Sequence, residues 1–122
     1  MDEKCVRLSV PAEATFARPV RMMAASLAAG CEMSLEDVED VRMIAEEGFV
    51  YACATGADLV EASFSLAPGV VSMEFSLGSE DPDDESIELV RVLLAAVCDE
   101  FSVSDDGFAL RLAKRSGSAH GE

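Results

Sequence analysis

A line of four residues holds the side chains with which this sequence could act on a ligand: Met43, Glu47, Tyr51 and Thr55. Their spacing of four places them on one side of a helix. Glu47 is the candidate acid–base group of this line, either as a working base or as a solvated carboxylate beside Glu46. Tyr51 also has two interpretations, because its ring either fills a ligand cleft or packs in the core.

The helix that must carry this line is predicted for residues 34–56. Ser34 followed by Asp37 is typical of a helix N-terminus, and Gly56 is typical of a helix end. A second set of residues, at spacings of three and four, forms a stripe that faces a core. Its members are Val38, Val41, Ala45, Gly48, Phe49 and Ala52.

The cysteines and the single histidine give no pattern for a metal site. Cys5, Cys31, Cys53 and Cys98 are widely spaced, and His120 lies near the end of the chain. A zinc site needs clustered ligands, and a disulfide framework usually belongs to an exported domain. We therefore predict no bound metal and interpret the cysteines as small buried or half-buried apolar residues.

The charge balance limits the partners that we expect. The formal net charge is −15, from 24 acidic and nine basic residues. DNA, RNA and anionic membrane surfaces reward clustered Lys and Arg, so neither a nucleic acid nor a membrane is expected as a partner. A basic protein surface is the natural partner of such a chain. The charged first ten residues contain no apolar signal region, which favours a cytoplasmic protein.

The other elements follow from apolar periodicity and turn residues. We predict strands at 4–10, 59–66, 70–77, 101–104 and 108–113, and further helices at 12–29 and 86–97. This order predicts an α+β two-layer sandwich, with three helices on one face of a mixed, mainly antiparallel sheet. Residues 1–115 form one domain, and residues 116–122 are expected to be a disordered tail.

Three local features of this prediction can be tested directly. Pro19 lies inside the first predicted helix, so the regular helix either begins near Arg18 or is kinked. The segment 78–85 is polar and strongly acidic, and we expect a loop there. Phe108 is expected to share a face with Phe101 and Val103 across the turn at residues 105–107.

Several runs of this sequence resemble the bacterial anti-sigma factor serine/threonine kinases of the RsbW/SpoIIAB type. The runs are Phe16-Ala17-Arg18, Leu35-Glu36-Asp37-Val38, Ile44-Ala45-Glu46-Glu47 and Val97-Cys98-Asp99-Glu100-Phe101. The family belongs to the GHKL superfamily of histidine kinase-like ATPases. The resemblance therefore implies a GHKL fold, a homodimer and, in an intact member, ATP and Mg²⁺ as cofactors.

The central helix of that family carries Glu-x-x-x-Asn, in which the glutamate is a general base and the asparagine holds Mg²⁺ against the ATP phosphates. Glu47 matches the glutamate. Tyr51 occupies the asparagine position, and a phenol does not replace a compact amide carbonyl as a Mg²⁺ ligand.

The glycine motifs of the family are also replaced. An Asp-x-Gly-x-Gly motif that reads adenine aligns with Leu77, Ser79 and Asp81. A Gly-x-Gly-Leu motif that cradles phosphate aligns with Glu88 and Val90. The carboxylates that crowd this region are those of Glu80, Asp81, Asp83, Asp84, Glu85 and Glu88. The resemblance thus implies a degenerate member that has lost ATP and magnesium.

Arg18 matches an arginine with which the family grips its sigma factor, and Arg21 follows three residues later. The alternative is a pair of surface arginines lying along apolar neighbours. Our leading hypothesis is a pseudokinase that sequesters a sigma factor or an anti-sigma antagonist. The alternatives are an active kinase with a divergent nucleotide site and an acidic interaction subunit unrelated to sigma factors.

Overall fold

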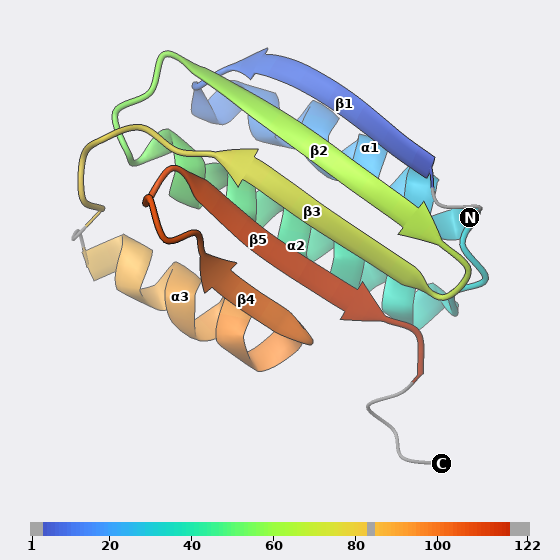
Figure 1. Ribbon diagram of the computed structural model, residues 1–122. Coiled ribbons are helices and arrows are strands. Elements are labelled where there is room, and N and C mark those ends of the chain that lie inside the picture. The colour runs from blue at the N-terminus through green and yellow to red at the C-terminus, as the bar shows by residue number, and fades with distance from the viewer. Residues whose placement is uncertain (1–3, 83–84, 118–122) are drawn as a thin grey trace.

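The computed structural model describes residues 4–82 and 85–117. Its elements are β1 (Lys4–Pro11), a 3-10 helix η1 (Ala14–Phe16), α1 (Ala17–Ala29), α2 (Leu35–Cys53), β2 (Leu59–Ala67), β3 (Val70–Ser76), α3 (Glu85–Val97), β4 (Glu100–Val103) and β5 (Ala109–Arg115) (Figure 1). The predicted order of strands and helices is confirmed. The described residues do not include Asp83, Asp84, His120 or the predicted tail beyond its first two residues.

The five strands form one sheet in the order β1-β2-β3-β5-β4. The α+β class is confirmed, but the prediction of a mixed sheet is wrong, because all four pairings of the described strands are antiparallel. Two helices connect β1 to β2, so the chain returns to the end at which β1 finished. β3 and β4 run in the same direction, but β5 lies between them and pairs antiparallel with both.

The helices cover one face of this sheet, with α3 beside α2 at the β4 end (Figure 1). Because α1 begins at Ala17, Pro19 falls in its first turn, where a missing N–H costs no helical hydrogen bond and no kink is needed. α2 begins with the predicted capping residues: Ser34 Oγ accepts from Asp37 N at 3.1 Å, and Ser34 N donates to Asp37 Oδ2 at 3.3 Å. Among the described residues, no helix combines the length and apolar character that a bilayer crossing requires.

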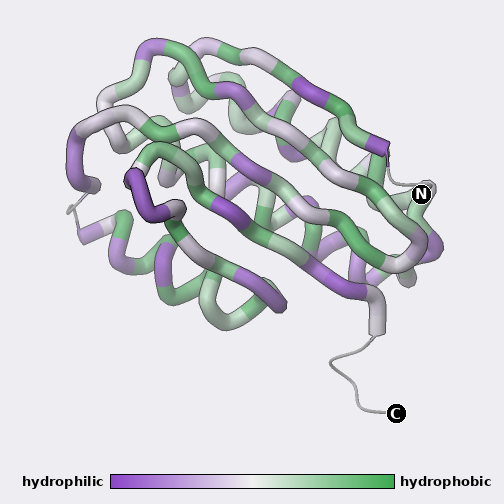
Figure 2. The backbone as a smooth tube through the Cα atoms, in the orientation of Figure 1, coloured by the Kyte–Doolittle hydropathy of each residue, from purple (hydrophilic) through white to green (hydrophobic). Residues whose placement is uncertain are grey.

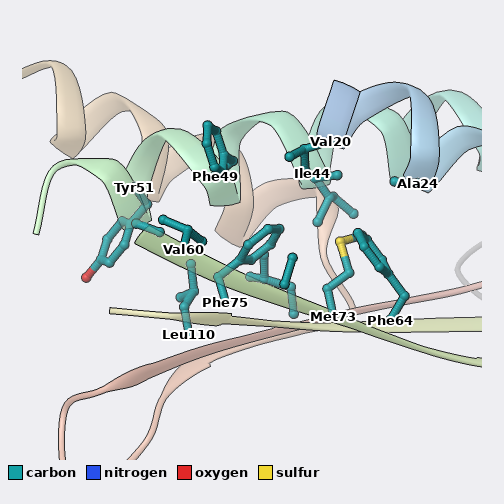
Figure 3. Packing of buried hydrophobic residues seen from close by; sticks show 14 of the residues in the cluster. Val20, Ala24, Ile44, Phe49, Tyr51, Val60, Phe64, Met73, Phe75 and Leu110 are labelled. Atoms are coloured by element: carbon teal, nitrogen blue, oxygen red, sulfur yellow. The ribbon is translucent and has the colours of Figure 1, made fainter. Parts of the chain in front are cut away.

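Hydrophobic and hydrophilic residues alternate along the central strands (Figure 2), and in β2 and β3 only alternate residues are buried in the core. Phe49 of α2 and Phe64 and Phe75 of the sheet are completely buried in it (Figure 3). Between β4 and β5, Phe101 lies opposite Leu112 and Val103 opposite Leu110. β5 begins at Ala109, one residue after its predicted start, and Phe108 before it is 53% exposed.

Gly48 sets how closely α2 approaches the sheet. A Cβ atom at this position would lie 2.8 Å from both Leu112 Cδ1 and Phe75 Cε2. Real Cβ atoms are not found at such distances, so any larger residue must push the helix or these two side chains away. The stripe of core-facing residues predicted from the sequence correctly includes Gly48. Its missing side chain leaves room for Phe75 and Leu112.

A buried lysine ties the N-terminal half of α2 to the sheet. Lys114 is on the helix side of β5, only 7% exposed, and its Nζ lies 3.2 Å from Asp40 Oδ2. Burial alone would raise the pKa of Asp37, but hydrogen bonds from Ser34 and Gly117 and the charge of Lys114 hold that pKa below its usual value. The ion pair and the helix cap therefore form one connected polar group at this end.

Replacing Gly48 by alanine should destabilise the protein. Helix propensity alone favours alanine by about 1 kcal/mol, but overpacking a core costs about 1–3 kcal/mol. We expect a net loss of up to about 2 kcal/mol in the free energy of unfolding, measured by urea denaturation. The matched control is Gly30→Ala, where the new Cβ meets only Leu27 O at 3.6 Å and φ is −92°. The control variant should be unchanged or slightly stabilised, and equal stability of the two variants would contradict the packing argument.

Candidate functional site

A cleft of about 320 Å³ lies where three segments meet at one end of the molecule. α2 contributes Tyr51 from its last turn, the turn after α2 contributes Thr55, and the loop after β3 contributes residues 77–82. The hairpin between β4 and β5 contributes Val103 and residues 106–108. These segments are far apart in sequence and come together at the same end of the sheet (Figure 1).

The structure brings together four of the predicted nucleotide positions. Tyr51, Leu77, Ser79 and Asp81 all line this cleft. Glu88 and Val90 do not belong to the described lining, because Glu88 is exposed on α3 and Val90 is buried in the core.

The hydroxyl of Thr55 fastens the loop after β3 to the end of α2. Thr55 is 2% exposed, and its Oγ1 donates to Ala52 O at 2.6 Å and accepts from Gly78 N at 2.7 Å. The Thr55 carbonyl accepts from Glu80 N at 2.9 Å. Three hydrogen bonds at one residue thus fix the floor of the cleft. The sequence placed Thr55 on the line with Tyr51 but gave no sign of its partner.

Gly78 is needed for close approach between these two segments of backbone. A Cβ atom there would lie 2.3 Å from Thr55 O and 2.7 Å from Ala57 N. At the neighbouring Gly56, whose φ is +82°, a Cβ would come within 2.6 Å of Glu80 Cδ. The space that these glycines leave is therefore filled by the protein's own backbone and by the side chain of Glu80.

Arg91 of α3 contacts two residues that line the cleft, Tyr51 and Pro82. Its guanidinium carbon lies 5.6 Å from the centroid of the Tyr51 ring, and its Nη2 donates to Pro82 O at 3.0 Å. Interaction with the Tyr51 hydroxyl, and then the charges of Glu88 and Asp81, hold the pKa of Arg91 above its usual value against the opposing effect of burial. Tyr51 itself is 6% exposed, and its hydroxyl points away from the core cluster (Figure 3).

Sequence reasoning missed Arg91. The signal that was available is its spacing from Glu88, because residues three apart on a helix are neighbours. The two do form an ion pair, with Arg91 Nη1 against Glu88 Oε2. The contacts with Tyr51 and Pro82 could not be predicted in the same way, since they depend on how α3 packs against α2.

Three carboxylates of the described lining lie outside the ion pairs of the described residues, although charge interactions reach Asp81 from Arg91 and Asp106 from Arg111. None of the ion pairs among the described residues includes Glu80, Asp81 or Asp106. Hydrogen bonds from the Ser104 hydroxyl at 2.6 Å and from Phe108 N at 3.0 Å keep the pKa of Asp106 below its usual value. The cleft is therefore strongly negative around its mouth.

Glu47 lies on α2 one turn before Tyr51 but is not among the described residues that line the cleft. It is half-buried, and this burial, followed by the charge of Glu46, raises the pKa of its carboxyl group. A raised pKa is the direction that a general base near neutral pH requires.

The two arginines of α1 have different surroundings. Arg21 Nη1 lies 3.2 Å from Glu46 Oε1, so this side chain joins α1 to α2. Arg18 is exposed and forms no ion pair within the described residues. Of the two predicted partner-binding residues, Arg18 is the one that is free to meet another molecule.

Comparison of this chain with models of protein families and with curated proteins found no match. The chemistry of the cleft therefore has to be argued from its own residues.

Removing the Thr55 hydroxyl should loosen the cleft floor. Thr55→Val keeps the shape but leaves the Gly78 amide without a buried acceptor, which costs about 1–3 kcal/mol in unfolding free energy. Hydrogen exchange at the Gly78 amide should become faster. Thr55→Ser is the control: it loses a methyl group but keeps the hydroxyl, so exchange at Gly78 should stay slow. Equal exchange in both variants would show that the hydroxyl does not hold the loop.

Glu47→Gln should stabilise the protein in a pH-dependent way. Because folding raises the pKa of Glu47, the native state binds more protons than the unfolded state between the two pKa values, and stability falls as pH rises through this window. Glutamine cannot lose a proton, so the variant does not lose stability in this window. Its free energy of unfolding should exceed that of the unchanged protein at neutral pH and equal it below the usual glutamate pKa. Urea denaturation at both pH values measures it. Glu39→Gln, an exposed position paired with Arg42, should show no such gain.

Proposed function

We propose that this chain is a regulatory binding protein of the anti-sigma-factor type, a degenerate GHKL domain that acts in the cytoplasm without nucleotide. It would occupy a sigma factor or an anti-sigma antagonist as a homodimer. Without ATP it has no means of changing partners by phosphorylation. The support is the order and packing of the elements together with the chemistry of the cleft.

The main support is that groups of the cleft already bind one another through the contacts that a nucleotide would need. Gly78 N is bonded to Thr55, so it is not free to approach a ligand. Tyr51 is buried beneath Arg91, and its phenol is a poor Mg²⁺ ligand. These residues do not fit a magnesium-bound triphosphate.

Charge points in the same direction. Glu80, Asp81 and Asp106 would face the phosphates. Two like charges about 4 Å apart repel by roughly 4 kcal/mol at an effective dielectric constant of 20. Several carboxylates against a tetra-anion, with no asparagine to hold a metal between them, disfavour ATP by more than the remaining contacts could offset.

An active kinase is the second candidate, and one observation favours it. The raised pKa of Glu47 suits a general base. A base without a positioned substrate contributes little, however, and the described lining of the cleft does not include Glu47. The third candidate, an acidic interaction subunit unrelated to sigma factors, shares the binding role and differs only in the partner.

Two measurements test the proposal. Isothermal titration with Mg-ATP should give no binding at micromolar concentrations, and a micromolar dissociation constant would overturn the loss of the nucleotide site. Capture of partners from native cell extract should recover a sigma factor or its antagonist. Arg18→Glu should abolish that capture, whereas Arg7→Glu, exposed on the open face of the sheet, should not. Indifference of the captured partner to Arg18→Glu would exclude the α1 mode.

A further inference from the structure

The mouth of the cleft exposes apolar surface that the fold does not cover. Phe108 is 53% exposed and Val103 is 42% exposed, and both belong to the hairpin side of the cleft. Val103 lies opposite the buried Leu110 and is therefore on the helix side of β4, where it is still partly exposed. Exposed apolar groups gathered in a concave site and rimmed by polar residues are typical of an interaction surface.

The size of the cleft limits what can enter. Its volume of about 320 Å³ is at the lower end of the range for small-molecule sites, which is about 300–1,000 Å³. That space suits one long side chain and part of a neighbour. The cleft is also open at the surface, so a segment of another chain could lie across it.

The charge of the rim selects the kind of side chain. Glu80, Asp81 and Asp106 form no ion pair within the described residues, although the charge of Asp81 acts on Arg91 and that of Arg111 acts on Asp106. Both hydrogen bonds accepted by Asp106 use Oδ1, which leaves Oδ2 as a further acceptor. No group of three or more His, Cys, Asp or Glu within the described residues is arranged to hold a metal ion, whereas apolar walls suit the stem of an organic cation.

The protein itself shows how a guanidinium binds in this neighbourhood. Arg91 lies over the Tyr51 ring and donates to the Pro82 carbonyl. The exposed ring of Phe108 and the carboxylates beside it offer the same combination of aromatic face and acceptors, and no cation of the described residues lies over that ring. A cation over an aromatic face contributes about 0.5–1 kcal/mol at an exposed site.

We propose that the cleft is a docking site for a basic segment of a protein partner, in which an arginine next to an apolar residue packs against Phe108 between Glu80 and Asp106. The apolar neighbour contacts Val103. This interface uses neither Arg18 nor α1, so it stands or falls separately from the anti-sigma proposal.

Titration of the ¹⁵N-labelled full chain with the blocked peptide Gly-Leu-Arg-Leu-Gly tests this directly by NMR. Amide shifts should cluster at Gly78, Ser79, Gly107 and Phe108, with a dissociation constant of about 1 mM or tighter. A second peptide carrying citrulline for arginine keeps the shape and removes the charge. It should bind at least about fivefold more weakly. Raising the salt concentration should weaken binding of the arginine peptide.

Variants locate the contact. Phe108→Ser should weaken binding of the arginine peptide about fivefold, and Glu80→Gln should weaken it about twofold to fivefold. The matched controls are Leu35→Ser and Glu36→Gln, which remove an exposed apolar group and an exposed carboxylate at the opposite end of α2. Both controls should bind like the unchanged protein. Because Phe108 is exposed, its replacement leaves the core intact.

Four results would overturn the proposal. They are equal binding of the citrulline peptide, shifts spread over the acidic surface without regard to the variants, the same cleft shifts with spermidine alone, and cleft shifts that depend on protein concentration without peptide. The first two would show that no specific basic site exists. The third would assign the cleft to a small polycation, and the fourth to a second copy of this chain.

Discussion

The close approach of α2 to the sheet at Gly48 is the constraint on which the rest of the structure depends. With no side chain at this position, the helix lies against Phe75 and Leu112, whose atoms occupy the space a Cβ would need. This contact fixes the height of the helix above the sheet. The last turn of α2 then arrives level with the end of β3, where Thr55 can reach Gly78. A wider spacing would open the floor of the cleft.

Most of the fold could be predicted because its signals are local. The capping residues Ser34 and Asp37 and the alternating strands each report on a few neighbouring positions. The start of β5 one residue later than predicted has a physical cause: Asp106 Oδ1 accepts from Phe108 N and Ser104 Oγ, so Phe108 belongs to the turn. The sheet was expected to be mixed because the sequence shows strand order poorly, and the position of β5 between β3 and β4 is a long-range outcome.

The candidate site was predictable only in part, for a related reason. Tyr51, Leu77, Ser79 and Asp81 were placed together by a family resemblance, and they do share a cleft. What holds that cleft, however, is a set of contacts between helices and loops. Arg91 reaches Tyr51 and Pro82 from a third helix, and no spacing rule within one helix encodes such a contact. Gly78 shows the limit clearly, since its role is to fit against Thr55, a residue far away in the sequence.

The arrangement of charges at this end of the molecule favours one orientation of a bound partner. The N-terminal end of α1, with the exposed Arg18, lies at the same end as the cleft (Figure 1). Arg21, one turn later, pairs with Glu46 of α2, and Arg91 is held by Glu88 and the Pro82 carbonyl. Arg18 and the carboxylates around the cleft, by contrast, form no ion pair within the described residues. A partner that contacted both would need an acidic group beside a basic one. Such a pattern favours one orientation over its reverse, because like charges would then face each other. The net charge of −15 attracts basic surfaces in general, and this local reversal of sign is what could select among them.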